Sequence, residues 1–157
     1  MRFGFKHSRQ FLFLRLKLQN DAAKDMSNAD PADGLPNDVL QAKLLDIQKM
    51  LRTREIVQAE AAIDKLLIAN PMHPETHYTY AVIKRLLKKE DVALSALDRL
   101  HQIEPDHGRG YQEKGFIWMA RKNLSLAIKA FEKAVDLDSA LISSWKSLCG
   151  LYELGKN

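Results

Sequence analysis

Apolar and small residues recur along residues 108–141 at the three- and four-residue spacings of a helix. They form two stripes, one on each side of a polar turn at residues 121–123. The stripe residues are Tyr111, Gly115 and Trp118 in the first segment and Ala127, Phe131 and Ala134 in the second. Because residues three and four apart lie on the same side of a helix, this pattern predicts two helices that pack together through a short turn.

The same pattern recurs 34 residues earlier in the sequence, in four independent series of positions. The series are Ala59, Ala93 and Ala127; Ile63, Leu97 and Phe131; Leu66, Leu100 and Ala134; and the prolines Pro71 and Pro105. A period of roughly 20–50 residues is typical of a solenoid of stacked helical hairpins. We therefore expect an all-α helical-hairpin solenoid with repeats at about 40–73, 74–107 and 108–141, followed by a half repeat at 142–157.

The sequence also predicts how the repeat array begins and ends. Asn37 or Asp38 is expected to cap the first helix, which should span residues 39–52. In the last helix, at residues 142–154, Trp145, Leu148 and Tyr152 should face the preceding pair, and Cys149 should lie on the buried stripe. The chain stops where another second-type helix is expected. A terminal capping helix would explain this, but truncation of a longer protein explains better why the Lys-Asn turn recurs at 156–157.

The first 25 residues differ from the rest in charge. They carry six basic and two acidic side chains, an excess that equals the net charge of +4 of the whole chain. The remaining 132 residues are therefore neutral taken together, and the helical body has no global electrostatic attraction for nucleic acid. Residues 1–20 are basic and apolar and lack the roughly 20 consecutive apolar residues that a transmembrane span needs. A translation start placed too far upstream, an organellar targeting peptide or a membrane-surface segment at residues 1–20 all remain open, and residues 26–38 are expected to form a flexible linker.

In the repeat region described above, the sequence resembles the tetratricopeptide repeat (TPR) family. The resemblance rests on the Trp145-x-x-Leu148 pair with Tyr152, on the Ala127, Phe131 and Ala134 ladder, and on the closing prolines. It covers about residues 39–157. The sequence departs from the pattern at Lys43, where an aromatic residue is usual, and at Ser139, where a proline is usual. The resemblance implies a right-handed superhelix whose first-type helices line a concave groove for a peptide or a partner protein.

The resemblance also implies which side chains line that groove. They are Leu44, Gln48, Tyr78, Val82, Arg85, Arg109, Gln112, Phe116 and Met119. Apolar side chains with two arginines suit an extended or helical segment that carries an acidic group. Some members of the family hold a terminal carboxylate with a clamp of basic and amide side chains. Here Leu44, Gln48, Thr79 and Glu113 stand at clamp positions, so a chaperone-tail role is not expected.

A narrower resemblance gives an alternative. Residues 108–145 are similar to the repeat segment that precedes the catalytic domain in bacterial TPR-containing sulfotransferases. This resemblance implies that the chain is the N-terminal arm of a longer enzyme. The phosphosulfate-binding loop of that enzyme class is not present in the 157 residues.

Residues with catalytic or ligand-binding chemistry are few in this sequence. His73 and His77 have a possible metal-ligand spacing, but His73 precedes Pro74 and no third ligand is evident, so histidines at the surface or at helix caps are expected instead. The one cysteine excludes an internal disulfide, and Cys149 has no nearby base that would make it a nucleophile. The sequence thus predicts a non-catalytic protein-binding scaffold without metal or cofactor, placed in the cytoplasm.

Overall fold

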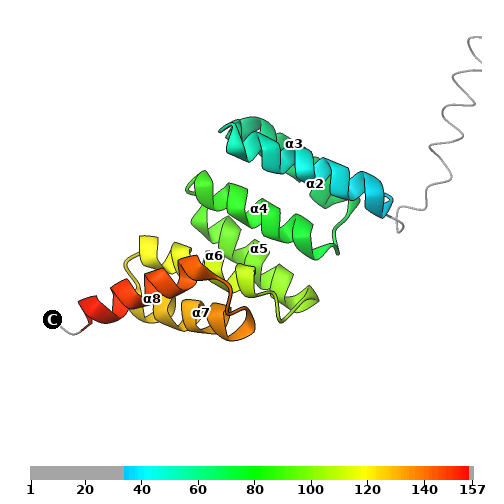
Figure 1. The fold of residues 1–157 in the computed structure, drawn as a ribbon. Helices are drawn as coiled ribbons and strands as arrows, with labels where there is room; N and C mark the ends of the chain where they lie inside the picture. The colour runs from blue at the N-terminus through cyan, green and yellow to red at the C-terminus, as the bar shows by residue number, and fades with distance from the viewer. Residues whose placement is uncertain (1–33, 156–157) are drawn as a thin grey trace, which may run out of the picture. The chain divides into compact units, whose positions relative to one another are not determined.

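The computed structural model describes residues 34–155, and within that range it contains seven helices and no strand (Figure 1). The predictions for residues 1–25 and for most of the 26–38 linker lie outside the described residues. The helices are α2 (Asn37–Arg52), α3 (Ile56–Ala69), α4 (Pro74–Leu86), α5 (Glu90–Ile103), α6 (Gly108–Ala120), α7 (Leu124–Leu137) and α8 (Ile142–Leu154). The fold is the all-α helical-repeat solenoid that the 34-residue period predicts.

Helices that follow one another in sequence pack against one another along the whole array. First-type helices (α2, α4, α6 and α8) alternate with second-type helices (α3, α5 and α7), and α4 also contacts α6 directly. The tight turns inside the three pairs place one residue each in the left-handed region. These residues are Arg54, Lys88 and Lys122, at φ of 63°, 62° and 59°, and they stand 34 positions apart. The repeat therefore extends to the backbone of the turns.

The cap predicted for the first helix is wrong. Asn37 is the first helical residue of α2, and Pro36 occupies the N-cap position without a side-chain hydrogen bond. Side-chain caps do form later in the array. The Asn123 side chain accepts a hydrogen bond from the Leu126 backbone N–H, and His107 Nδ1 accepts one from the Gly110 backbone N–H at 3.0 Å. A capping role for histidine is therefore observed at His107.

The small-residue and apolar series predicted from sequence are buried in every repeat. Ala59, Ala93 and Ala127 are fully buried, and so are Ile63, Leu97 and Phe131. Gly115 shows why small residues are needed where paired helices approach. A Cβ added there would lie 2.6 Å from two ring carbons of Phe131, well inside van der Waals contact. The close approach of α6 and α7 thus depends on the absence of a side chain at that position.

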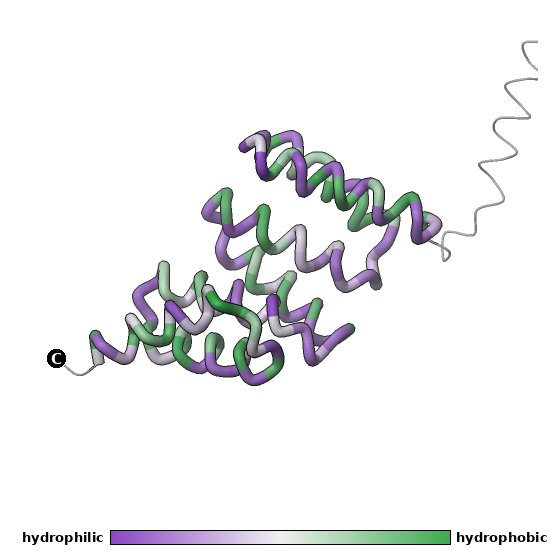
Figure 2. Tube along the Cα trace, in the orientation of Figure 1, coloured by the Kyte–Doolittle hydropathy of each residue, from purple (hydrophilic) through white to green (hydrophobic). Residues whose placement is uncertain are grey.

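Three apolar clusters form the core, and each joins one helical pair to the next first-type helix. Ile83 of α4 belongs to the cluster of α2 and α3, Ile117 of α6 to that of α4 and α5, and Leu151 of α8 to that of α6 and α7. These three residues are again 34 apart. Figure 2 shows the apolar and polar segments alternating along the helices, as amphipathic helices require. Burying each such side chain contributes about 1.5–3 kcal/mol.

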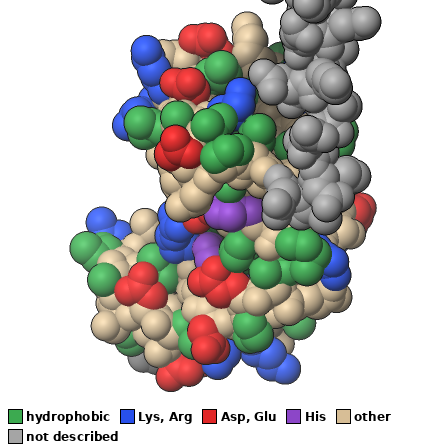
Figure 3. Space-filling view, turned by 90° about the vertical axis from the view of Figure 1, so that its right-hand side faces the viewer, with side chains coloured by type: hydrophobic (Ala, Val, Ile, Leu, Met, Phe, Trp, Pro, Cys, Tyr) green, Lys and Arg blue, Asp and Glu red, His purple; other side chains and the backbone are tan. Residues whose placement is uncertain are grey.

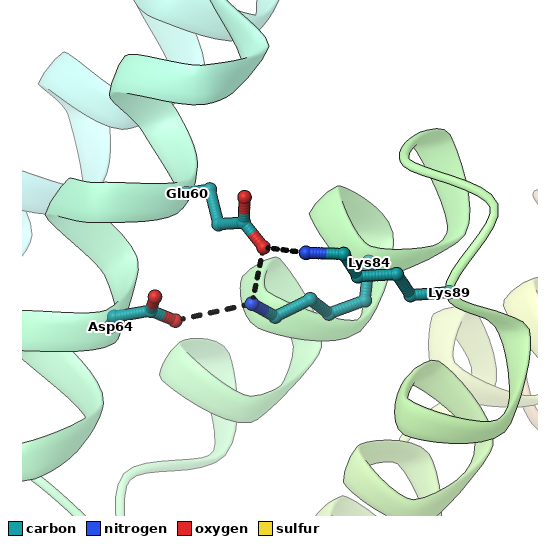
Figure 4. Close-up of polar contacts among 4 residues, drawn as sticks. All are labelled: Glu60, Asp64, Lys84 and Lys89. Atoms are coloured by element: carbon teal, nitrogen blue, oxygen red, sulfur yellow. Dashed lines mark hydrogen bonds and ion pairs between the residues drawn. The ribbon is translucent and has the colours of Figure 1, made fainter.

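One junction also contains a buried charge. Lys84 of α4 is only 6% exposed, and its ammonium contacts Glu60 Oε1 at 2.7 Å and Asp64 Oδ1 at 3.3 Å, both on α3 (Figure 4). Lys89 donates to the same Glu60 oxygen at 2.7 Å. Burial alone would lower the pKa of Lys84, but the hydrogen bonds to the two carboxylates more than offset it and raise the pKa. Lys84 is therefore charged, and its ion pairs with α3 join the first pair to the second.

The predicted residues of α8 face the preceding pair, but they differ in how far they are buried. Leu148 is buried, but Trp145 is 47% exposed and Tyr152 is 44% exposed. Both rings still reach back toward α7, since Trp145 Nε1 donates to the Ser139 carbonyl and the Tyr152 hydroxyl donates to Glu132. The prediction that Cys149 is buried is wrong, because the thiol is exposed. No second-type helix follows α8 within residues 34–155, so nothing there covers the side where Cys149 lies.

Candidate binding groove

The candidate site is a hollow of about 580 Å³ lined by three first-type helices. α2 contributes most of its wall, α4 contributes Glu75, and α6 contributes Arg109. The lining residues are Gln41, Ala42, Leu44, Leu45, Gln48, Glu75 and Arg109. Leu44, Gln48 and Arg109 were predicted from sequence, so the structure brings these three together although 65 positions separate the first from the last.

Arg109 is fixed by two contacts at the edge of the hollow. Its guanidinium donates to Glu75 Oε2 at 2.7 Å and lies 4.5 Å from the ring centroid of Tyr78. His107 is next to this pair, with its ring 5.1 Å from that of Tyr78. Histidine, basic and acidic side chains lie together where the face in Figure 3 is hollowed. Arg109 remains half exposed and keeps further N–H donors for a ligand.

Burial and neighbouring charges shift the pKa values of the ionisable groups around Arg109. Burial raises the pKa of Tyr78 to about 12, and the Glu113 carboxylate adds to the effect, so the Tyr78 hydroxyl stays protonated. Burial would also raise the pKa of Glu75, but the neighbouring His107 ring and the Arg109 guanidinium reverse the direction and lower it. Glu75 is therefore an anion, and the Glu75–Arg109 pair has no net charge.

A second ion pair lies further along the groove. Arg85 Nε of α4 donates to Glu113 Oε2 of α6 at 2.6 Å, and the guanidinium lies 5.5 Å from the ring centroid of Phe116. Burial raises the pKa of Glu113, and the positive charge of Arg85 opposes this shift without cancelling it. Both predicted arginines are thus engaged by carboxylates of the same chain. An acidic ligand group would have to share Arg109 or displace one of these pairs.

The other predicted groove residues differ in how accessible they are. Leu44 is buried in the first apolar cluster, and Phe116 packs edge-on against Phe131 at 5.2 Å between centroids, so both mainly support the wall. Gln112 accepts a hydrogen bond from Ser144 of α8 at 3.2 Å. Gln48 and Met119 are exposed, and Val82 is half-buried. Whether these side chains contact a partner stays a prediction.

Sequence reasoning missed four residues of the hollow. Gln41, Ala42 and Leu45 precede Leu44 or Gln48 on the same side of α2, so helical spacing could have identified them. Glu75 stands 34 residues before Arg109, at the same position of the preceding repeat. Equivalent positions on stacked helices are neighbours, so opposite charges 34 apart were a usable signal of this ion pair.

No metal-binding cluster occurs among residues 34–155, since no three His, Cys, Asp or Glu side chains there converge on a common point. His77 Nε2 instead lies 2.7 Å from the Pro71 carbonyl oxygen. None of the helices within this range is long and apolar enough to cross a membrane. What the hollow offers is apolar surface, amide groups and one half-exposed arginine, which is chemistry for holding a peptide.

Comparison with known proteins gives structural likenesses only. No protein-family model matches the sequence, and no curated protein matches it. The first TPR of Spaghetti (RPAP3), solved bound to the HSP90 peptide SRMEEVD, is similar with a TM-score of 0.69 and 18% identity over 78% of this chain and 98% of that one.

Two further solved structures share the arrangement. The Sgt2 TPR domain from Aspergillus fumigatus has a TM-score of 0.69 and 12% identity, over 77% of this chain and 82% of that one. The Yersinia enterocolitica type III secretion chaperone SycD, in complex with a peptide of the translocator YopD, has a TM-score of 0.67 and 11% identity, over 78% and 98%. With the 34-residue register and the seven stacked helices, these likenesses show that the described part of this chain has the fold of a tetratricopeptide repeat domain.

Proposed function

We propose that the chain is a non-catalytic scaffold that binds a peptide or protein segment in the groove lined by α2, α4 and α6. The observation that carries the proposal is the hollow itself, because three helices from different repeats contribute to one open surface of about 580 Å³. A preformed surface of this kind requires little ordering when a ligand binds, which favours affinity.

The groove chemistry indicates the kind of segment that fits. Leu45 is 60% exposed and offers apolar contact, while Gln41 and Gln48 offer amide groups for the ligand backbone. Arg109 keeps donors free for a ligand carbonyl or carboxylate beside its pair with Glu75. We infer an extended or helical segment with an apolar side chain next to an acceptor group.

The similar structures support this use of the fold. The RPAP3 domain is solved with an HSP90 peptide and SycD with a YopD peptide, so the same arrangement of helices holds peptides in both. Their ligands do not transfer to this chain. The clamp positions here hold Leu44, Gln48, Thr79 and Glu113, and Glu113 is already paired with Arg85.

A peptide-display selection tests the proposal. The full chain selects peptides from a random library, and the enriched peptide is titrated by fluorescence polarisation against the parent, Leu45→Glu and Ile68→Glu. Leu45→Glu should weaken binding at least tenfold, or about 1.4 kcal/mol. Ile68 is the matched control, because it is 82% exposed on α3 and does not line the hollow. Equal affinity for all three proteins, or a library without enrichment, would refute the proposal.

The alternative from the sequence is that this chain is the N-terminal arm of a longer, sulfotransferase-like enzyme, and it stays a prediction. Membrane contact through residues 1–20 and placement in the cytoplasm stay predictions as well. A reading frame that continues past Asn157 into a phosphate-binding loop would support the enzyme alternative, and unchanged liposome binding after removal of residues 1–25 would exclude the membrane contact.

A further inference from the structure

The turns at the two edges of the array differ in charge. The tight turns inside the helical pairs carry five basic side chains and one acidic one, over residues 53–55, 87–89 and 121–123. The turns between successive pairs carry three acidic side chains and no lysine or arginine, over residues 70–73, 104–107 and 138–141. Because the charges of residues 26–157 cancel in sum, composition does not reveal this separation. The fold gathers basic charge at one edge and acidic charge at the other.

The three tight turns follow one another along one edge of the array, which is here called the tight-turn edge (Figure 1). Lys89 of the second turn donates to Glu60, in the helix that follows the first turn. Arg121 of the third turn donates to Glu90 Oε2 at 2.9 Å and to Asp91 Oδ1 at 2.6 Å, the first two residues after the second turn. Neighbouring turns therefore lie within the reach of one side chain, so their charges act together.

These ion pairs leave one basic side chain of each tight turn without a carboxylate. Arg54, Lys88 and Lys122 are exposed, and none of them forms an ion pair within residues 34–155. They are also the three residues in the left-handed backbone region, where glycine is the least strained residue. The local backbone therefore does not explain why a basic side chain stands at this position in every turn. An anionic partner along the tight-turn edge explains it.

An exposed aliphatic side chain stands beside each of these turns. Val57, Leu86 and Leu124 are 71%, 44% and 41% exposed. The turns themselves contain no aromatic residue on which a nucleic-acid base could stack. Basic side chains mixed with exposed aliphatic ones are typical of surfaces that lie on an anionic bilayer, because the charges meet lipid headgroups while the aliphatic groups enter the interface. The composition of this edge thus favours a membrane surface over nucleic acid.

We propose that the tight-turn edge docks on an anionic phospholipid bilayer. Three points always lie in one plane, so a flat surface can meet Arg54, Lys88 and Lys122 at once. The acidic turns lie at the opposite ends of the helices, so the separated charges also orient the domain on the surface. None of the residues in the three tight turns lines the peptide-binding hollow, so the inference stands or falls independently of the proposed function.

Cosedimentation of the full chain with vesicles of equimolar phosphatidylcholine and phosphatidylserine tests the charge row. Lys88→Glu/Lys122→Glu should bind roughly tenfold more weakly than the parent or worse, because two attractive charges become repulsive. Lys65→Glu/Lys129→Glu is the matched control, since it makes the same change in net charge at exposed lysines on α3 and α7, and it should bind like the parent. Residues 1–25 are the same in all three proteins, so any binding through them is common to all. Equal binding by the parent and the turn variant, or an equal loss in the control, would overturn the proposal.

Fluorescence from single labels tests the orientation without charge variants. In a Cys149→Ser background, which removes the only native thiol, a nitrobenzoxadiazole label is attached either at Leu124→Cys beside the third tight turn or at Ile68→Cys at the opposite end of α3. Both side chains are exposed. The equimolar vesicles should shift the emission of the first label to the blue and leave the second unchanged, because only the tight-turn edge enters the interface. Equal shifts at the two positions, or none at the first, would contradict the proposed docking.

Other anionic partners are outcomes of the same comparison. The parent is titrated with a single-stranded oligodeoxynucleotide and with polyglutamate at the salt concentration of the vesicle assay. Weaker binding to both than to the vesicles is expected, because neither polymer offers an interface for the aliphatic side chains. Binding to either polymer that is as tight as to the vesicles, and is lost in Lys88→Glu/Lys122→Glu, would assign the edge to that partner and overturn the membrane proposal.

Discussion

Helices α6 and α8 occupy the same place in successive repeats and differ in what covers them. α6 packs against α7 so closely that Gly115 has no room for a side chain. α8 presents Cys149 at the same register position to solvent, and its two aromatic rings are about half exposed. One sequence pattern thus gives a core position in one repeat and a surface position in the next. The repeat register sets the direction of a side chain, and the neighbouring helix sets its burial.

The largest expected contrast is between an aromatic residue of the covered pair and one on the uncovered helix. Phe131→Ala should lower the free energy of unfolding by roughly 3–5 kcal/mol, because Phe131 is fully buried and its loss leaves a cavity. Trp145→Ala should cost less than half as much, since that ring is half exposed. Urea unfolding of both variants measures the contrast. Similar losses in the two variants would mean that α8 is covered in solution.

Small-to-large substitutions at Gly115 and Cys149, which occupy the same register position, should change stability differently in α6 and α8. Gly115→Ala should destabilise the domain by roughly 1–3 kcal/mol, because the new methyl group would collide with the fully buried Phe131 ring. Cys149→Leu adds more volume but should change stability by no more than about 0.5 kcal/mol at an exposed site. Thermal unfolding at low protein concentration checks both. A severe loss in Cys149→Leu would contradict the exposure of this face.

The two repeat junctions on either side of the α6–α7 pair should differ in how their contribution to stability depends on pH. His101 of α5 stacks on Tyr111 at 3.8 Å, and at the equivalent position of α7 stands Val135. Burial lowers the pKa of His101 from 6.5 to about 4, and the charges of Lys114 and, to a smaller extent, His107 act in the same direction. The His107 carbonyl and the nearby Asp98 carboxylate oppose this shift.

The sign of the effect follows from proton uptake. As the pH falls, the unfolded chain protonates His101 first, so the contribution of this residue to stability is complete above pH 6.5 and is lost as the pH falls toward 4. His101→Leu should therefore be less sensitive to pH between 6.5 and 4 than the parent. Urea midpoints at pH 7, 6 and 5 measure this sensitivity. Parallel pH profiles for the parent and the variant would assign the sensitivity to other groups.

The smallest expected effect is a gain in stability on the open helix. Gly150→Ala should stabilise the monomer by roughly 0.5–1 kcal/mol, because alanine restricts the unfolded chain and nothing lies within 4 Å of the new methyl group. The measurement is urea unfolding at a concentration below that of any self-association. A loss of stability would show that another group occupies the space above Gly150.

Much of the core could be predicted from residue spacing. The series that begin at Ala59, Ile63 and Leu66 are buried in all three repeats, because a helix of fixed period must turn the same face toward its partner each time. The series of Ile83, Ile117 and Leu151 was missed, although it has the same period. These residues pack against the preceding pair, and spacing alone does not show which of two neighbours a helical face meets.

The groove was predictable only in part. The resemblance supplied Leu44, Gln48 and Arg109 at the hollow, although Leu44 is also part of the first apolar cluster, and it listed Phe116, which packs in the core. It gave no sign that Arg85 and Arg109 are already paired with Glu113 and Glu75. Ion pairs between repeats depend on how far one helix is displaced from the next, and that displacement arises from packing along the whole array.

The sequence by itself determined the class of fold, the 34-residue register, the turns and the small residues at the close helix contacts, because these depend on local spacing and side-chain volume. Tertiary structure alone decided the buried charge at Lys84, the pairing of both groove arginines with carboxylates of the chain and the exposure of Cys149. Each of these depends on which atoms of a distant segment lie within a few ångströms, and periodicity carries no information about such distances.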